Sequence, residues 1–576
     1  MRRNGLISII TGSIWFLGIF LVIVLWATLG LLVFWDYEGS IQQIIRYLSA
    51  DLPLQEQIRN GFFTESKYYA ILILLAVLGC FWAGIFVSLQ SCSIQYFVTQ
   101  LFKAFSRFQN RFKKLWPANT LERWGLFWIT IVLGGLWVAG LLFFPMTYDE
   151  AWFYESHVRK SPLYALVYYP YPGNHILYTL ITSLLHKIYS DFHFCMRLPN
   201  LILGLSSITF LWLYVQKLIG LWRGTFVVSV IGLGLSVALY SFLGRGYLLF
   251  AVSVCLFLIS LVQWNTKPNS TAWLSGLLIS GFVAGATQPT FGYWWATSSI
   301  WFLFVNKQNV NIYKKYIAYS CLLMLMLLTW YLPAITFVNV IHLRQNELLK
   351  AYSYAEIWGF LFEYWNYVWE SITIYKLGGL ASAIMFGYWV REYWYFKKAS
   401  VLLFLLLSIL PLMVILIQRI FPPDKTWIPL VFVWGSFWVE ILPKLVIRGK
   451  IANYLLISVA ALILTNQIIG FIPAVWDRFQ VDFSAQNVYK VIQAAKAQKI
   501  LISPEGRQEL SGYEVILRGY EYNDSKIKLV DYSNDVPDAA IVPNNNQLPE
   551  YFRIQKYNYK KKYQDNRVAV YLKSPV

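Results

Sequence analysis

Long apolar runs separated by short polar segments form the dominant pattern of this chain. A membrane-spanning helix needs roughly 20 apolar residues, and each span must satisfy its own backbone polar groups, so repeated runs of this length indicate helices. About thirteen runs fit that description, although several are short. They cover residues 14–35, 69–89, 124–144, 198–215, 225–242, 247–262, 273–286, 291–305, 316–337, 377–390, 401–417, 427–442 and 454–472. The pattern predicts a polytopic α-helical membrane protein.

The segment from Asn174 to Tyr189 shows a different pattern. Its Ile and Leu residues recur at helical spacing on one face. The other face carries its polar residues: Thr179, Thr182, Ser183, His186 and Lys187. This arrangement favours an amphipathic helix in the membrane interface over a membrane span.

The charges of the connecting loops fix the expected orientation. When residues 174–189 are not counted as a span, the basic connections fall on one side of the membrane. They contain Arg2, Arg3, Lys103, Arg107, Arg111, Lys113, Lys114, Arg223, Lys267, Lys314, Lys315, Lys397, Lys398, Lys444, Arg448 and Lys450. By the positive-inside rule this side is cytoplasmic. The N-terminus is then cytoplasmic, while the loops 36–67, 145–197 and 338–376 and everything after residue 476 are extracytoplasmic.

The last hundred residues differ in composition from the rest of the chain. Polar and charged residues increase, and short alternating runs at 499–503, 526–530 and 568–572 are typical of strands. A helix-like stretch at 488–497 precedes them. We therefore expect three regions: an extra two-span region at 1–123, a transmembrane core at 124–476, and a small extracytoplasmic α/β domain at 477–576.

Composition supports the membrane assignment. The chain has 576 residues, of which 58% are hydrophobic and 13% charged, and its formal net charge is +19. Because the basic residues cluster in short loops between apolar runs, we expect the lipid bilayer, not nucleic acid, to be the partner. The five cysteines are scattered and show no CxxC spacing, which favours small buried residues over a zinc or redox site.

A pair of carboxylates, Asp149 and Glu150, follows the run 124–144 by about five residues. The low-dielectric surroundings of a membrane surface can raise the pKa of a carboxyl group toward the range of a general base. The alternative is an ordinary solvated pair. We expect Tyr148, which precedes the pair, to contribute to substrate binding.

Two arginines share the expected side of these carboxylates. Arg197 begins a span, and Arg245 lies in the turn LGRGY between two runs. Ionisable groups at membrane depth are costly, and guanidinium groups suit phosphate oxygens. The two arginines therefore indicate a lipid-linked phosphate, with an ion pair to Asp149 or Glu150, or contact with lipid headgroups, as the alternatives.

Three further residues are candidates for substrate binding. His175, in PGNH, could orient substrate or donate to a phosphate, or it could be a structural hydrogen bonder. Gln288 lies at a break between two runs. Such a break can line a cavity, or it can be an ordinary turn between two helices. Lys425, in FPPDKTW, is a cation that precedes a run on the outer side, and it could bind substrate or serve as an interfacial anchor.

Sequence signatures of soluble nucleotide-dependent enzymes are absent. The chain has no Walker A loop, GxGxxG fingerprint, HExxH helix or GxSxG elbow. No cofactor is indicated, although Asp149 and Glu150 could accept a divalent cation.

Several of these segments together resemble a known family. The elements TYDEAWF, PGNHILYTLI, RLPNLILGLSSI and YSFLGRGYLLF, in this order and on this side, look like the GT-C glycosyltransferases of the protein O-mannosyltransferase and lipid A aminoarabinose transferase type. The resemblance covers roughly residues 124–305. It implies a GT-C fold and a donor sugar on a polyprenyl phosphate. Because the sequence shows no repeat-containing luminal domain like that of the eukaryotic protein mannosyltransferases, we expect a bacterial member of the family.

The resemblance also implies roles for individual residues. Asp149 would deprotonate the acceptor hydroxyl, Glu150 would help to position substrate, and Arg197 and Arg245 would bind the leaving lipid phosphate. The family often carries a Pro-Pro-Leu element, in some members after a lysine, where this chain has Gly173 to Leu177, so His175 could replace a phosphate-binding cation. The acceptor would be an extracytoplasmic lipid, glycan or protein.

Two other functions remain open at the level of sequence. A transporter or flippase of lipid-linked glycans would carry charged residues deep in spans of both halves of the chain, and few are found. A polymerase or ligase of surface polysaccharide would transfer a chain of sugars instead of one.

Overall fold

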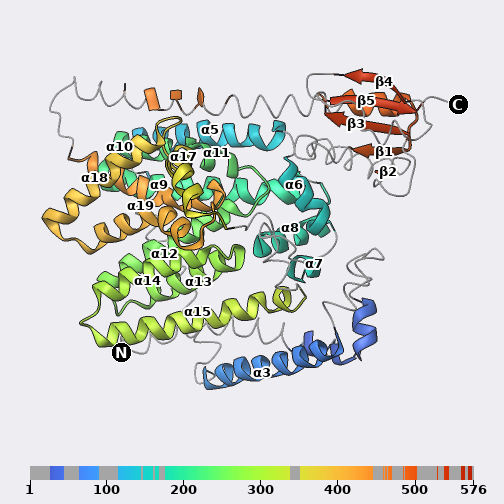
Figure 1. Ribbon diagram of the computed structural model, residues 1–576. Helices are drawn as coiled ribbons and strands as arrows, with labels where there is room; N and C mark the ends of the chain where they lie inside the picture. Colours follow the sequence, from blue (N-terminus) through green and yellow to red (C-terminus); the bar gives the residue numbers. More distant parts are fainter. Residues whose placement is uncertain are drawn as a thin grey trace. The chain divides into compact units, whose positions relative to one another are not determined.

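The computed structural model describes a helical bundle and a small sheet (Figure 1). The described residues are 64–89, 119–144, 147–159, 162–167, 175–191, 193–337, 351–444, 487–502, 538–543, 559–564 and 568–573, with 528–529 and isolated positions in 26–43, 115–117 and 458–484. They divide into two compact units. The first contains residues up to Val138 and His157–Gln467, and the second contains Ala139–Ser156 and Ile468–Val576.

Helices make up the first unit, and their bounds follow the apolar runs. In chain order they are α3 (Glu65–Leu89), α5 (Thr120–Phe143), α7 (Pro162–Val167), α8 (Ile176–Ile188), the π-helix η3 (His193–Arg197), α9 (Leu198–Ile219), α10 (Leu221–Leu233), α11 (Leu235–Tyr240), α12 (Tyr247–Thr266), α13 (Thr271–Thr287), α14 (Phe291–Val305), α15 (Val310–Phe337), α17 (Tyr354–Ile372), α18 (Gly378–Phe396), α19 (Ala399–Gln418), the 3₁₀-helix η5 (Asp424–Leu430) and α20 (Val431–Ile441).

Five helical segments of the described chain are long and apolar enough to cross a membrane. They are Thr120–Phe143, His193–Ile219, Tyr247–Thr266, Val310–Leu332 and Ala399–Gln418, and shorter apolar helices lie between them. The predicted multi-pass α-helical membrane architecture is therefore confirmed. The predicted runs 14–35 and 454–472 lie largely outside the described residues.

Two predicted spans are not single α-helices. The run 225–242 is divided at Gly234 into α10 and α11, and residues 241–246 form a turn. The run 427–442 begins as the 3₁₀-helix η5 and continues as α20. Both irregular segments contribute to the candidate site described below.

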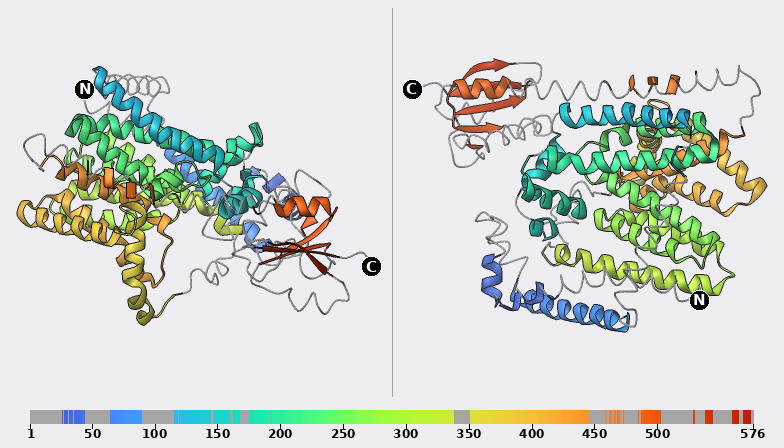
Figure 2. Two further views of the ribbon diagram at one scale, coloured as in Figure 1. Left: turned by 90° about the horizontal axis from the view of Figure 1, so that it is seen from above. Right: turned by 180° about the vertical axis from the view of Figure 1, so that it is seen from behind.

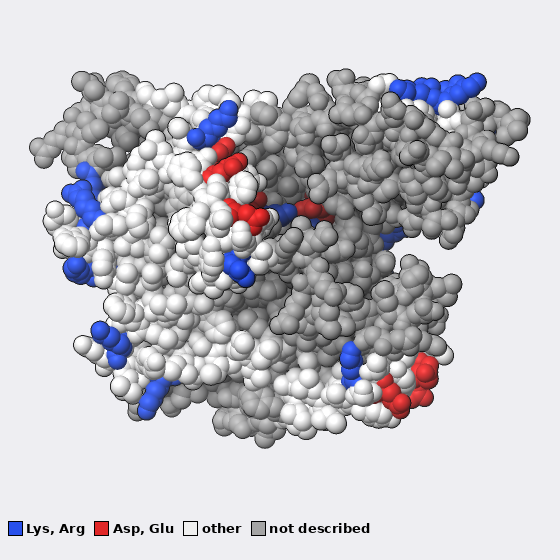
Figure 3. Space-filling model, in the orientation of Figure 1, with Lys and Arg blue, Asp and Glu red and all other residues white. Residues whose placement is uncertain are grey.

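The structure places the basic connections of the first unit at one end of the bundle. The amide of Asn306, after α14, donates to Asn265 near the end of α12 (2.7 Å), and Trp301 donates from α14 to the carbonyl of Ala399 at the start of α19 (2.6 Å). These contacts bring the connections that carry Lys267, Lys307 and Lys398 together. Figure 3 shows Lys and Arg along the left edge of the bundle, and acidic residues next to further basic ones in the upper middle of the same face.

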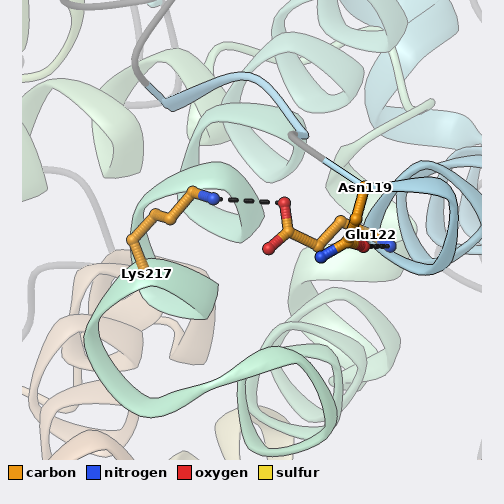
Figure 4. Close-up of polar contacts among 3 residues, drawn as sticks. All are labelled: Asn119, Glu122 and Lys217. Carbon is orange, nitrogen blue, oxygen red and sulfur yellow. Dashed lines mark hydrogen bonds and ion pairs between the residues drawn. The ribbon is translucent and has the colours of Figure 1, made fainter.

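An ion pair joins α5 to α9 at this basic end. Lys217, near the end of α9, contacts Glu122 in the first turn of α5 at 3.1 Å, and Asn119 caps that turn by accepting from the Glu122 amide at 2.8 Å (Figure 4). Because both charged groups are partly exposed, the pair contributes at most about 1 kcal/mol to stability. The ion pair also shows how the two helices are arranged: the start of α5 lies beside the end of α9.

Aromatic side chains fill much of the core of the first unit. Trp264 of α12 stacks on Phe302 of α14 at 5.1 Å, and Phe302 stacks on Tyr316 of α15 at 4.4 Å, centroid to centroid. Such offset pairs add to the dispersion energy of apolar packing, which matters where the surrounding lipid is itself apolar. The stacking fixes α12, α14 and α15 side by side.

Helix α17 was not predicted. The predicted loop 338–376 contains this helix of 19 residues, which begins with a capping box: Ser353 accepts from the amide of Glu356, and Glu356 accepts from the amide of Ser353 at 2.7 Å. The segment lacks a long apolar run, so the search for spans passes over it. Its Ser-x-x-Glu signature was the sequence signal that could have revealed it.

The second unit contains a five-stranded sheet of order β2-β1-β3-β5-β4. Strands β1 (Lys499–Ile502), β2 (Lys528–Leu529) and β5 (Val568–Lys573) confirm the three predicted strands. The strands β3 (Ala539–Pro543) and β4 (Tyr559–Gln564) were missed. A helix at 487–494 packs Val488 and Ile492 with β1, β3 and β5, which gives the small α/β arrangement that the composition predicted.

Candidate functional site

The predicted carboxylate pair lies in the short helix α6 (Tyr148–Phe153), which belongs to the second unit. Glu150 is fully buried and accepts hydrogen bonds from the amide (3.0 Å) and the hydroxyl (3.1 Å) of Thr147. The amide of Glu150 donates back to the Thr147 hydroxyl at 3.3 Å. This is a capping box, so one carboxylate oxygen of Glu150 stabilises the start of α6. Asp149 is partly exposed.

The turn that carries Arg245 is fixed from another helix. The side-chain amide of Asn200, in the first turn of α9, donates to the carbonyls of Leu243 (2.5 Å) and Arg245 (2.6 Å). Asn200 is fully buried, and leaving a buried carbonyl without a donor costs about 1–3 kcal/mol. This amide therefore replaces the backbone partners that the break between α11 and α12 removes.

Gly246 lets the same turn approach the start of α8 closely. A Cβ atom at Gly246 would lie 2.6 Å from the Cβ of His175 and 2.9 Å from the Cβ of Tyr178. These distances are shorter than carbon contacts allow. Tyr178 in turn donates from its hydroxyl to the carbonyl of Met196 at 2.5 Å, so α8, η3 and the Arg245 turn form one packed assembly.

Tyr247 is the centre of the candidate site. Its ring lies 4.2 Å from the His175 ring in an edge-on arrangement and 4.9 Å from the ring of Tyr240. The guanidinium of Arg245 lies 5.7 Å from the centroid of the Tyr247 ring, and the ammonium of Lys425 lies 5.2 Å from it. Both are within cation–π range. We call these five residues the Tyr247 cluster.

The turn that presents Lys425 is fixed by α17. The hydroxyl of Tyr364 accepts a hydrogen bond from the indole of Trp427 at 2.7 Å and donates to the carbonyl of Pro422. Tyr367, one turn further along α17, hydrogen-bonds the Asp424 carboxylate. These bonds span residues 422–427 and so determine where Lys425 points.

Asp424 places a carboxylate beside Lys425. Burial raises the pKa of this carboxyl group above its ordinary value, while hydrogen bonds from the backbone and the charge of Lys425 act in the opposite direction. The net direction is upward because desolvation disfavours the charged form. The charge balance near the cluster can therefore change with pH.

The predicted cation Arg197 ends the π-helix η3 and is fully buried. It precedes Asn200 by three residues, a spacing that places both on one face of the helix. Arg197 therefore lies within one helical turn of the residue that holds the Arg245 turn in place.

Gln288 follows the end of α13 and is buried. Because α12 and α13 form an antiparallel hairpin, Gln288 lies at the end of that hairpin where α12 begins with Tyr247. Its side-chain oxygen has no hydrogen-bond partner among the described residues. It is therefore an acceptor at the same end of the bundle as the Tyr247 cluster.

The structure thus unites three of the predicted residues, His175, Arg245 and Lys425, around one ring. Tyr247 and Asp424 were not singled out by the sequence analysis, although Tyr247 is two positions after Arg245 and Asp424 adjoins Lys425. The predicted Tyr148 lies in α6, and Asp149 and Glu150 lie beside it in the second unit.

This arrangement is suited to binding an anion. Two cations and an imidazole meet around the Tyr247 ring; His175 and Arg245 are buried, where charge-assisted hydrogen bonds are stronger than in water, and Lys425 is partly exposed. The described residues contain no group of three or more His, Cys, Asp or Glu side chains that could hold a metal ion.

No family model matches the chain, and a comparison with curated protein sequences gives no match. Among solved structures, the chain is similar to ArnT from Cupriavidus metallidurans in the apo state, with a TM-score of 0.51 and 12% identity over 79% of this chain and 98% of that one. The crystal structure of the same ArnT bound to undecaprenyl phosphate aligns over 77% and 97%, with a TM-score of 0.45 and 12% identity. The likeness to the apo structure shows that this chain has the membrane fold of ArnT, as the predicted GT-C fold class requires.

Proposed function

We propose that the protein is an inverting membrane glycosyltransferase that moves a sugar from a polyprenyl phosphate to an extracytoplasmic acceptor. The observation that carries this proposal is the Tyr247 cluster, which gathers Arg245, Lys425 and His175 at one end of the bundle. Such a cluster suits a phosphate group at the membrane surface. The shared fold with ArnT and the family resemblance of residues 124–305 support the same class of donor.

The proposed chemistry needs only groups that the chain supplies. Asp149 accepts the proton of the acceptor hydroxyl while the acceptor oxygen attacks the anomeric carbon. The bond from that carbon to the phosphate oxygen breaks, and its electron pair stays with the polyprenyl phosphate. Arg245, Lys425 and Arg197 stabilise the negative charge that grows on the phosphate. Attack opposite to the leaving group inverts the configuration.

Glu150 has a supporting role in this proposal. Its capping box with Thr147 fixes the first turn of α6 and therefore the position of Asp149. Glu150 then acts through geometry, and Tyr148 in the same turn contributes to substrate binding.

We place the site outside the cytoplasm, in the inner membrane of a bacterium. The contacts of α14 with Asn265 and Ala399, and that of Lys425 with Tyr247, support a placement of the basic connections at one end of the bundle and of the Tyr247 cluster at the other. The positive-inside rule assigns the basic end to the cytoplasm. A lipid-linked donor fits the opposite end, where nucleotide sugars are absent.

The proposal is tested with purified protein in liposomes supplied with a polyprenyl-phosphate sugar and an acceptor. Asp149→Asn should lower kcat by at least about 100-fold, because a neutral amide cannot accept the proton. Arg245→Gln should chiefly raise the KM for the donor. Glu363→Gln, which changes an exposed carboxylate on α17, is the matched control.

Normal transfer by Asp149→Asn would remove this residue as the base. Movement of the lipid-linked sugar across the bilayer without any product would support the flippase instead. Mass spectrometry of the product separates the transfer of one sugar from that of a chain.

A further inference from the structure

Only part of the apolar surface of helix α17 is buried against the rest of the protein. Ile357, Val368 and Trp369 are buried against the bundle. On the flank of this buried strip, Tyr354, Trp358 and Phe362 follow one another at intervals of four residues and are 56%, 65% and 80% exposed. Residues four apart lie on the same helix face, so these three aromatics form a continuous stripe.

The opposite side of α17 carries three acidic residues, and the exposed rings of Phe360 and Tyr367 lie beside them. Glu356, Glu363 and Glu370 recur every seven residues and form a line roughly 140° around the helix from the aromatic stripe. The helix contains no Lys or Arg. An exposed aromatic stripe opposite an acidic line is the pattern of a helix that rests between an apolar and an aqueous phase.

The direction of α17 fits this interpretation. Figures 1 and 2 show α17 running across α18 and α19, the second of which is long enough to span a membrane. A helix that crosses the spans lies near the membrane plane. Helix α18 begins six residues after α17 ends, and its early residues Leu380 and Ile384 are 60% and 57% exposed, so the apolar surface continues into a membrane-facing helix.

Cations lie beside the aromatic residues at both ends of α17. The guanidinium of Arg419 lies 5.8 Å from the ring centroid of Tyr354, and the ammonium of Lys376 lies 5.6 Å from that of Tyr375. Aromatic and basic side chains are the usual anchors at the level of lipid headgroups. Phosphate groups of the bilayer can therefore complement both ends of the helix.

We propose that the stripe formed by Tyr354, Trp358 and Phe362 inserts into the outer leaflet of the bilayer, with the acidic line facing water. The occupant of this surface is lipid, in the headgroup and upper acyl region. Through Tyr364 and Tyr367 the same helix contacts the turn of Lys425, so the membrane surface provides a support for one wall of the candidate site. The proposal concerns membrane contact and requires no catalytic activity.

The experiment compares two neighbouring positions in full-length protein in lipid nanodiscs. Phe362→Cys and Glu363→Cys are each labelled with a small environment-sensitive fluorophore. Quenching is measured with lipids that carry a nitroxide near the headgroup and, separately, with iodide in the water. The unsubstituted protein, labelled in parallel, gives the background from the native cysteines.

The label at position 362 should be quenched by the nitroxide lipid at least about threefold more strongly, relative to iodide, than the label at 363. Trp358→Cys should follow position 362, and Glu356→Cys should follow position 363. Equal access of iodide to 362 and 363 would overturn the proposal by placing the stripe in water. Protection of 362 from both quenchers would overturn it too, because a protein surface would then cover the stripe.

Discussion

The imidazole of His175 meets the ring of Tyr247 edge-on at 4.2 Å, although four helices, η3, α9, α10 and α11, separate α8, which His175 precedes, from α12, which Tyr247 begins. This contact joins the start of α8 to the start of α12. Because Arg245 and Lys425 lie over the same ring, Tyr247 fixes three candidate ligands at once. A change of this one ring should therefore affect the placement of all three side chains.

We expect Tyr247→Leu to weaken donor binding. Each cation–π contact that it removes is worth about 0.5–2 kcal/mol, so the KM for the polyprenyl-phosphate sugar should rise roughly 2- to 30-fold for each cation that becomes misplaced. Tyr247→Phe retains the ring and should stay within about twofold of the wild type. Steady-state kinetics in liposomes make the comparison. Equal values for the Leu and Phe variants would show that the ring does not organise the cations.

Gly246→Ala should destabilise the protein by about 1–3 kcal/mol, the usual cost of forcing an extra methyl group into a packed region. The backbone of Gly246 is compatible with alanine (φ −69°), so the clash with His175 and Tyr178 is the cause. Thermal unfolding in detergent measures the effect.

The control is Gly292→Ala in the first turn of α14. A Cβ atom there would meet nothing within 4 Å. Alanine in a helix is favoured over glycine by up to about 1 kcal/mol, so this variant should unfold at the same or a higher temperature. A loss of stability at both positions would mean that the helical bundle tolerates no added methyl group and that the His175 contact is not special.

Asp424 should make stability fall as pH rises. The folded protein raises the pKa of this carboxyl group, so between its unfolded and folded pKa values the native state binds more protons than the unfolded state. The contribution to stability is complete below the unfolded value of 3.8 and is lost as pH increases through the folded value. Asp424→Asn should remove this dependence. Compared with the wild type at the same pH, the variant should therefore gain more stability at neutral pH than at acid pH. Unfolding measured across this range in both proteins checks the sign, and a wild-type curve parallel to that of the variant would contradict it.

The helices could be predicted because a segment that crosses lipid must be a helix of roughly 20 mostly apolar residues. Such segments are visible in the sequence as long apolar runs. The irregular elements could not be predicted in this way. Gly234 divides a run in which only small polar residues and one tyrosine interrupt the apolar ones, and α17 has no long run at all, although its Ser353-x-x-Glu356 signature is visible. In the second unit, β3 is a nearly uniform apolar stretch and β4 a highly charged one, so neither shows the alternation that identifies a half-buried strand.

The sequence allowed the charged and polar residues of the candidate site to be predicted, but not Tyr247 at its centre. Arg245, Lys425 and His175 stand out because polar groups are rare near apolar runs. Tyr247 does not, since 40 tyrosines occur in the chain and most would serve equally well as interfacial anchors. The capping role of Glu150 is visible in the sequence as Thr147-x-x-Glu150. A search for catalytic carboxylates overlooks this local pattern.

The contact between Asn200 and the Arg245 turn also bears on how the protein is made. A chain is synthesised and inserted from its N-terminus, so Asn200 is in the membrane before Leu243 and Arg245 emerge. The side-chain amide of Asn200 is then already in place to donate hydrogen bonds to a turn whose carbonyls have no regular backbone partners. The turn at residues 241–246 would then be held in place only once α11 and α12 have reached α9, and an insertion error in the helices between would leave the Tyr247 cluster unassembled.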